Sequence, residues 1–325
     1  MSNIVFILGA GASIPYGYPS GPALVNQILD TLHPRYIHKI QLKAKILGSD
    51  RFSSSELTQS FSDQALYLKH GFDQKLIEYF SNSLSMSNKD SIDSFLLERK
   101  EFYEIGKFAI ANCILKCENP TVFQDSNGNW LRYLWNKINL SKSAFSFHNI
   151  AFISFNYDRV LEYFFYTSLK HSFNLKDDEI NDLLNSKPIL HLHGTVGHLP
   201  WQDSENGFEY YFSGSDIETY YHRVSEASKN IRIIHDEVNA TKDVSERAFE
   251  LMNTSDRIYI IGLGFQSLNL ERLRIKEIQK RFICSAYGLT KHESEIIQSR
   301  YPSKLVLSKN EYDSLDFLRN TLSLK

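Results

Sequence analysis

The stretch Ile4-Val5-Phe6-Ile7-Leu8-Gly9-Ala10-Gly11-Ala12-Ser13 lies near the start of the chain and decides the fold. Its first five residues are apolar and rich in β-branched side chains, as in a strand buried on both faces of a parallel sheet. Glycines after such a strand let the backbone approach a pyrophosphate and present amides to it at the start of a helix. The stretch therefore predicts an α/β sheet that binds a nucleotide at the carboxyl ends of its strands.

The dinucleotide-binding fingerprint of dehydrogenases is incomplete in this turn. That fingerprint requires a third glycine where this chain has Ile14, and an acidic residue for the ribose, whereas Asp30 falls within a helical pattern. A strand-to-helix turn without a ligand is the alternative. The number of small residues in and after the turn favours the nucleotide: Gly9, Gly11, Ser13, Gly17 and Gly21.

Five further candidate strands follow, the first of which begins at residue 151. Segments with a helical pattern separate them. They span residues 151–155, 188–193, 257–262, 281–286 and 304–307. Regular alternation of strands and helices indicates βαβ units. We therefore expect an α/β fold with a doubly wound, parallel, Rossmann-like sheet.

Residues 35–145 have a different character, because their apolar side chains recur at helical spacing. One such stripe contains Ile92, Phe95, Leu96, Arg99 and Tyr103, and another contains Trp130, Leu134 and Ile138. We expect a Rossmann-like domain at 1–34 and 146–325, interrupted by an all-helical insertion at 35–145. Three pairs with capping-box spacing predict later helix starts: Ser215/Glu218, Thr290/Glu293 and Ser308/Glu311.

The composition restricts the class of protein. The chain has 325 residues and a net charge of -2, so it has no bulk attraction to nucleic acid or to acidic membranes. Its three cysteines, Cys113, Cys117 and Cys284, are too few for a disulfide framework or for the four ligands of a structural zinc site. No segment has the pattern of a signal peptide or the length of a membrane span. We therefore expect a cytoplasmic protein that binds neither nucleic acid directly nor a membrane.

Two polar side chains follow the candidate strand 151–155. Asn156 and Asp158 are two residues apart, so both can face the same way beyond the strand end. They are candidates for contact with a ligand in the pocket at this edge of the sheet. An Asx turn or a helix cap is the alternative, because Asn and Asp supply both routinely.

Two histidines, His191 and His193, lie two residues apart on the next candidate strand, and His198 follows. A metal site is one alternative, but no carboxylate or thiolate with suitable spacing lies close by. A hydrogen-bonded core histidine is the second alternative, and it fits His191. His193 precedes Gly194 at the strand exit, where a ring can reach a ligand and transfer a proton near neutral pH.

A second glycine-rich exit follows the candidate strand 257–262. It reads Gly262-Leu263-Gly264 and is followed by Asn269. Such an exit suits the other half of a dinucleotide, and a plain βα turn is the alternative.

These four elements, in this order, resemble the sirtuin superfamily. Gly9, Ala10, Gly11 and Ser13 match the Gly-Ala-Gly-x-Ser turn that binds the NAD diphosphate in sirtuins. The other matching residues are Asn156 and Asp158 for the Asn-x-Asp motif, His193 and Gly194 for the His-Gly motif, and Gly262 and Gly264, with Asn269 after them, for the adenosine side. Deacylase sirtuins carry a four-cysteine zinc module, which this chain cannot build. The pattern is therefore similar to the zinc-less sirtuin-like domains of bacterial antiphage defence systems.

That resemblance implies an NAD+ hydrolase that releases nicotinamide and ADP-ribose as the effector of abortive infection. NAD is then the substrate, and no metal is required. Asn156 is expected to orient water or the ribose hydroxyls, His193 to act as general base, and Asp158 to hold the nicotinamide carboxamide. The resemblance also implies a homo-oligomer or a sensor partner, such as an Argonaute-type protein or a hexameric ATPase. The alternatives are an NAD- or ADP-ribose-binding sensor and a structural subunit without turnover. A protein deacylase is a further alternative, and the missing zinc ligands argue against it.

Overall fold

The structure is a computed structural model that describes residues 3–32, 63–125, 128–138, 150–185, 188–214, 216–233 and 238–324. The chain divides into two compact units, which we call the sheet unit and the helical unit. The sheet unit comprises Met1–Tyr18, Glu118–Phe212 and Asp236–Lys325, and the helical unit comprises Pro19–Cys117 and Ser213–His235. These boundaries differ from those expected from the sequence, because the segment from residue 118 belongs with the sheet and residues 213–235 belong with the helices.

The sheet unit contains six parallel strands in the described part of the chain, which confirms the predicted fold class. They are β1 (Ile4–Leu8), β2 (Ile150–Ser154), β3 (Ile189–His191), β4 (Arg257–Ile261), β5 (Phe282–Cys284) and β6 (Leu305–Leu307). Their order across the sheet is β3-β2-β1-β4-β5-β6. The order reverses between β1 and β4, and an open α/β sheet binds its ligand at such a switch point.

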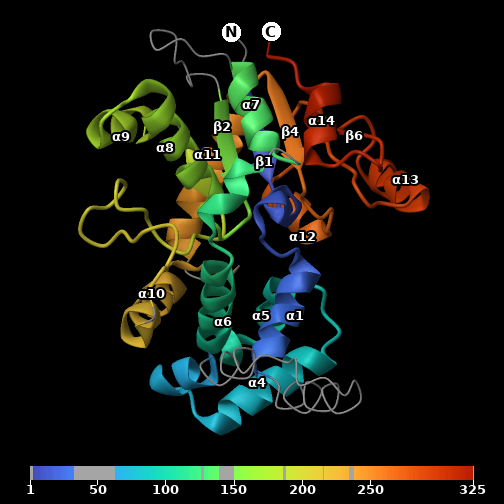
Figure 1. Cartoon of the computed structure of the whole chain (residues 1–325). Coiled ribbons are helices and arrows are strands. Elements are labelled where there is room, and N and C mark those ends of the chain that lie inside the picture. Colours follow the sequence, from blue (N-terminus) through green and yellow to red (C-terminus); the bar gives the residue numbers. More distant parts are fainter. Residues whose placement is uncertain are drawn as a thin grey trace, which may run out of the picture. The chain divides into compact units, whose positions relative to one another are not determined.

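Helices cover both faces of this sheet, as in a doubly wound fold (Figure 1). On one face, Val5 and Ile7 of β1 belong to an apolar core that includes Ala248 and Met252. On the other face, Phe6 stacks between Phe152 and Tyr259, with ring centroids 5.5 and 5.4 Å apart. The described helices of the unit are α7 (Trp130–Ile138), α8 (Val160–Phe173), α9 (Asp177–Asn185), α11 (Val238–Thr254), α12 (Ser267–Arg272), α13 (Lys291–Arg300) and α14 (Ser314–Thr321).

The helical unit is built around one helix that is buried on all sides. Its described helices are α1 (Gly21–Leu32), α4 (Gln74–Met86), α5 (Ile92–Glu98), α6 (Tyr103–Lys116) and α10 (Ile217–Asn230). In α6 every residue from Ile105 to Leu115 except Lys107 is buried, as expected for a helix in the centre of a core. The predicted stripe from Ile92 to Tyr103 is shared by two helices rather than one, because the backbone leaves helical geometry at Arg99.

Two of the predicted helix starts show how capping works in this chain. Thr290 and Glu293 form the predicted capping box at the start of α13. Ser215 lies outside the described residues, and the next residue, Asp216, caps α10 by accepting hydrogen bonds from two backbone amides. A carboxylate there satisfies the unpaired N–H groups of the first helical turn.

The third predicted helix start, Ser308/Glu311, is wrong. The helix begins later, at Ser314, and Asp313 caps it by accepting from the amides of residues 315 and 316. The hydroxyl of Ser308 instead accepts a hydrogen bond of 3.2 Å from the amide of Ala286 and so joins the exits of β5 and β6. A local spacing rule cannot see this contact, because it spans 22 residues.

Candidate functional site

The exits of β1 and β4 meet at the switch point of the sheet. The amide of Gly9 donates to Ile261 O at 3.0 Å, and the amide of Gly11 donates to Gly262 O at 2.9 Å. Gly262 has a φ of 63°, a left-handed conformation that favours glycine. A Cβ atom on Gly262 would also overlap the backbone nitrogen of Ala12. These glycines therefore allow two backbone turns to pack directly against each other.

This packing changes the expectation for the β1 turn. Besides the amides of Gly9 and Gly11, the amide of Ala12 donates to Gly9 O at 2.9 Å and that of Ser13 donates to Ala10 O at 3.0 Å. Four amides of the turn are thus engaged within the protein. Their assignment to a diphosphate stays a prediction, and a bound diphosphate would need further donors.

Asn156 joins the exit of β2 to the exit of β1. Its side-chain Nδ2 donates to Gly9 O at 3.0 Å and to Ser13 Oγ at 2.9 Å. Both amide hydrogens are therefore used, and the side chain is only 8% exposed. Within the described part of the chain no residue donates to Asn156 Oδ1, so this oxygen can accept a hydrogen bond from a water or a hydroxyl group.

Asp158 is buried beside the same serine. Burial raises the pKa of its carboxyl group, and a hydrogen bond with Ser13 acts in the opposite direction. Its Oδ1 accepts a hydrogen bond of 3.1 Å from the amide of Val160 at the start of α8. This bond to the amide two residues on is an Asx turn, the first of the two alternatives, because Arg159 is the N-cap residue of α8 and no side chain caps that helix. A role of Asp158 toward a ligand stays a prediction.

His191 is held inside the protein by two acceptors. Its Nδ1 lies 3.0 Å from Asn156 O, and its Nε2 lies 2.7 Å from Glu162 Oε1. Because neither partner can donate, both ring nitrogens must carry a proton, and the ring is an imidazolium. Burial alone would lower the pKa of His191, but the charge and hydrogen bond of Glu162 raise it to about 9. The structure thus confirms the interpretation of His191 as a hydrogen-bonded core residue.

His193 has a different environment, just beyond the end of β3. Its ring lies between those of Phe155 and Tyr157, at centroid distances of 5.5 and 5.7 Å, and it is 5% exposed. The Nη1 atom of Arg272 contacts its Nε2 atom. Since a guanidinium only donates, Nε2 accepts, and the ring is in the neutral form that a general base requires. Gly194, with a φ of 70°, then turns the chain away.

Arg272 is a residue that the sequence did not single out. It is the last residue of α12, the short helix after the exit of β4. Asn269 of the same helix donates to Gly264 O at 3.1 Å and so holds the loop between β4 and α12. This loop brings a guanidinium from the exit of β4 to the histidine at the exit of β3. Only its position after a glycine-rich exit could have indicated it.

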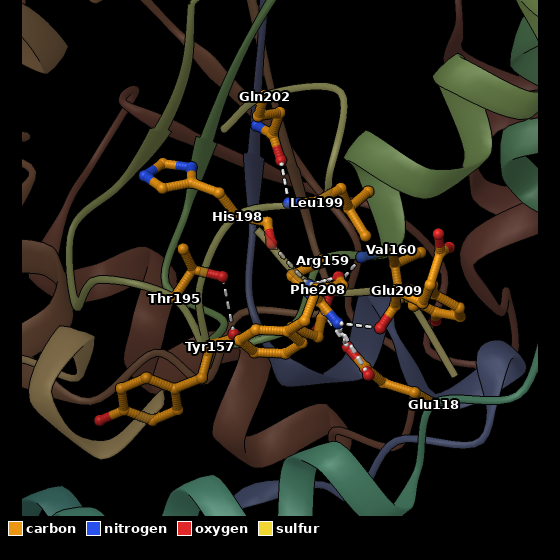
Figure 2. Close-up of polar contacts among 12 residues, drawn as sticks. Glu118, Tyr157, Arg159, Val160, Thr195, His198, Leu199, Gln202, Phe208 and Glu209 are labelled. Carbon is orange, nitrogen blue, oxygen red and sulfur yellow. Dashed lines mark hydrogen bonds and ion pairs between the residues drawn. The ribbon is translucent and has the colours of Figure 1, made fainter. Parts of the chain in front are cut away.

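The sequence also gave no indication of a buried ion pair next to Asp158. Arg159 is completely buried, and its Nε and Nη2 atoms each donate to the carboxylate of Glu118 at 2.8 Å. Its remaining hydrogens go to three backbone oxygens, those of His198, Phe208 and Glu209, at 2.8–3.1 Å. Figure 2 shows this guanidinium between Glu118 and the loop after β3. All five donors are satisfied, so Arg159 fixes that loop beside the Asn-x-Asp segment.

Two further hydrogen bonds hold the same loop near His193. Thr195 Oγ1 and the amide of Val196 both donate to Tyr157 O, at 3.0 and 2.9 Å. The segments that carry Asn156 and His193 are therefore connected by the backbone, and the Thr195 contact is drawn in Figure 2. This rigid connection suits a site whose groups must keep a set geometry.

Three further observations bear on the class of site. Among the described residues no group of three or more His, Cys, Asp or Glu side chains is placed to hold a metal ion. None of the described helices is both long enough and apolar enough to cross a membrane. A cavity of about 520 Å³ lies between α8, α9 and the loop after β3, and none of the predicted site residues lines it.

Comparisons with known proteins do not assign the chain to a family. No protein-family model matches it. No curated protein matches it either. The function is therefore inferred from the fold and from the geometry of the strand exits.

Proposed function

We propose that the chain is an NAD+ hydrolase that cleaves the bond between nicotinamide and ribose. The observation that carries this proposal is the neutral His193 at the exit of β3, on the same edge of the sheet as the Oδ1 atom of Asn156. Asn156 bonds Gly9 at the switch point between β1 and β4, where an open α/β sheet binds its ligand, and Arg272 connects His193 to the β4 side. The ordered resemblance to sirtuin motifs supports NAD as that ligand.

To cleave this bond, the protein has to orient the substrate and a water molecule and to supply one general base. Nicotinamide leaves as a neutral molecule from a cationic ring, so it takes the electron pair of the C–N bond and needs no general acid. The transition state resembles an oxocarbenium ion, as in other glycoside cleavage. The oxygen of a water forms the new bond to the ribose carbon, and its proton passes to His193 directly or through a ribose hydroxyl. Asn156 Oδ1 accepts from that water or from the ribose, and Asp158 holds the carboxamide.

Arg272 completes the proposed site. Because four amides of the β1 turn are engaged within the protein, a diphosphate needs a further partner, and a guanidinium suits phosphate geometry. In this proposal Arg272 holds Nε2 of His193 before the substrate binds and moves to the diphosphate when NAD enters. This movement exposes Nε2 of His193 to the proton that it accepts in the reaction.

The cellular role follows from the resemblance alone. We propose an effector of bacterial antiphage defence that depletes NAD in the cytoplasm, working as a homo-oligomer or beside a sensor partner. A specific observation also favours one rival, a sensor that binds NAD without turnover. Asn156 and Asp158 both have structural partners in the protein, as residues of a fixed binding frame would.

The test is incubation of the purified chain with NAD+, followed by chromatography for nicotinamide and ADP-ribose. Equal amounts of both products support hydrolysis, and a His193→Ala control must remove them. Turnover in the presence of a chelator is expected, because no step needs a metal. NAD-dependent thermal stabilisation without products would favour the sensor. Release of an acyl group from an acyl-lysine peptide would favour the deacylase.

A further inference from the structure

Arg272 and His193 meet across the middle of the sheet. Arg272 follows β4 and His193 follows β3, and strands β1 and β2 lie between these two in the sheet. The Nη1 atom of Arg272 nevertheless contacts the Nε2 atom of His193. Both residues belong to the sheet unit. The contact therefore bridges the exits of the two strands that carry the glycine-rich turn and Asn156.

In this arrangement the guanidinium covers the base of the proposed reaction. Nε2 of the neutral His193 ring has one lone pair, and Arg272 donates to it. The ring is only 5% exposed, with Phe155 and Tyr157 beside it. A general base needs its lone pair within hydrogen-bond distance of the proton that it takes. His193 can therefore act as the base only after Arg272 has moved.

The diphosphate is the part of NAD that can compete with His193 for Arg272. The side chain of Arg272 is half-buried, so a ligand at the strand exits can reach it. Hydrogen bonds from a guanidinium to phosphate oxygens are charge-assisted and frequently bidentate, whereas a neutral imidazole offers a single uncharged acceptor. The nicotinamide ring is a cation and repels the guanidinium, and the ribose is uncharged. Only the diphosphate can therefore draw Arg272 away from the histidine.

We propose that Arg272 restricts the reaction to nicotinamide nucleotides that carry a diphosphate, because only a diphosphate removes the guanidinium from His193. This inference rests on the proposed function and specifies its substrate class. Nicotinamide riboside has the same scissile bond, and its hydrolysis takes up one water and gives nicotinamide, ribose and a proton. The riboside has no phosphate, so it meets a base that Arg272 still covers.

This role differs from that of a simple anchor for the diphosphate. An anchor binds the ground state and the transition state equally, so its loss raises KM and leaves kcat unchanged. A guanidinium that covers the base acts on the reaction step, so a substrate that cannot displace it has a low kcat even at saturation. Deletion of Arg272 separates the two roles. It leaves the rate on the riboside unchanged for an anchor and raises it for a guanidinium that covers the base.

Initial rates of nicotinamide release from NAD+ and from nicotinamide riboside test the proposal in the wild type. We expect kcat for the riboside to be at least about 100-fold lower, as for a missing general base. ADP and nicotinamide riboside are the two halves of NAD+. ADP should therefore raise the rate on the riboside about tenfold or more, and adenosine, which has no diphosphate, should leave it unchanged. Equal kcat for the two substrates, with a difference in KM only, would overturn the proposal.

A gain of activity is expected from Arg272→Ala. This change should raise kcat for the riboside about tenfold or more and remove its response to ADP. Arg274→Ala is the matched control, because that guanidinium bonds Glu246 and Glu277 rather than His193, and it should behave like the wild type. Thermal unfolding curves show whether both variants fold. A riboside rate that is unchanged or lower in folded Arg272→Ala would contradict the proposal.

A measurement without turnover separates this inference from the proposed function. Nitrogen NMR reports whether Nε2 of His193 accepts a hydrogen bond, and His193→Ala identifies the signal. We expect ADP to move this signal to the position that it has in Arg272→Ala, and adenosine to leave it in place. A signal that ADP leaves unchanged would overturn the proposal even if NAD+ is cleaved. Movement with ADP in a chain that does not cleave NAD+ would support the exchange of Arg272 and overturn the hydrolase.

Discussion

Two histidines that are two residues apart have opposite protonation states because their partners differ. His191 faces a carbonyl and a carboxylate, so it carries both protons and a charge. His193 faces the guanidinium of Arg272, so its Nε2 has no proton. Only the neutral ring can accept a proton in catalysis near neutral pH.

We expect His193→Ala to lower the rate of NAD cleavage by about 10²- to 10⁴-fold, because a positioned general base is lost. The fold should persist, since the change leaves the backbone at the strand exit and the neighbouring rings of Phe155 and Tyr157 in place. Nicotinamide release and a thermal unfolding curve are the measurements. Turnover close to that of the wild type in a folded variant would remove His193 from the mechanism.

Asn156→Ala removes a group expected to act mainly in the transition state. We therefore expect kcat to fall more than KM rises. The change also deletes the hydrogen bonds to Gly9 O and Ser13 Oγ, so stability should drop by about 1–3 kcal/mol. Steady-state kinetics, with ADP-ribose-induced stabilisation as the measure of binding, separates these effects. A variant that keeps kcat but loses binding would make Asn156 a binding residue only.

At the scale of elements, the glycine-rich exits of β1 and β4 pack against each other through their backbones, which leaves no room for a side chain on Gly262. Gly262→Ala should destabilise the protein by at least about 1–3 kcal/mol, because alanine is strained at positive φ and its Cβ would overlap the neighbouring turn. Gly264→Ala, where a Cβ meets no atom within 4 Å, is the control and should change stability by less than about 0.5 kcal/mol. Urea unfolding of both variants checks this. Similar stabilities for the two would contradict the close packing of the exits.

The Arg159–Glu118 pair holds the loop after β3. We expect the free energy of unfolding to fall more when one partner is removed than when both are removed together. Arg159→Met leaves a buried carboxylate without its partner and should cost about 3–5 kcal/mol. The double variant Arg159→Met and Glu118→Leu should recover part of this loss, because the uncompensated charge is gone. A double-mutant cycle by urea unfolding measures the coupling. Additive effects of the two changes would show that the pair does not act as a unit.

For the molecule as a whole, the His191–Glu162 pair predicts how stability depends on pH. The pKa of His191 is raised from 6.5 to about 9 in the folded state. The stability that the charged ring contributes to the folded protein is therefore fully present below about pH 6.5 and is lost as the pH rises through about 9. The pKa of Glu162 is lowered, since His191 outweighs the effect of burial, so that contribution is lost in acid. The difference in Tm between the wild type and His191→Gln should therefore shrink above pH 9. A difference that is constant from pH 6 to 10 would contradict a charged His191.

Much of the architecture could be read from short stretches of sequence. A buried parallel strand is a continuous apolar run, and small or polar residues mark its exit, so all six strands were predicted to within about two residues. The capping box of Thr290 and Glu293 was predicted for the same reason, because its partners are three residues apart. At Ser308 the same rule failed, since a contact with Ala286 from another strand exit takes its place.

What the sequence determined by itself is the set of strands and the polar residues at their carboxyl ends, because local patterns carry that information. Tertiary structure decided what each of those residues does. It placed the β4 exit against Gly9 and Gly11, so that their amides bond protein rather than a free ligand. It brought Arg272 to His193 across 79 residues and Glu118 to Arg159 across 41. Protonation state and hydrogen-bond partner depend on neighbours in space, and only the folded chain brings those neighbours together.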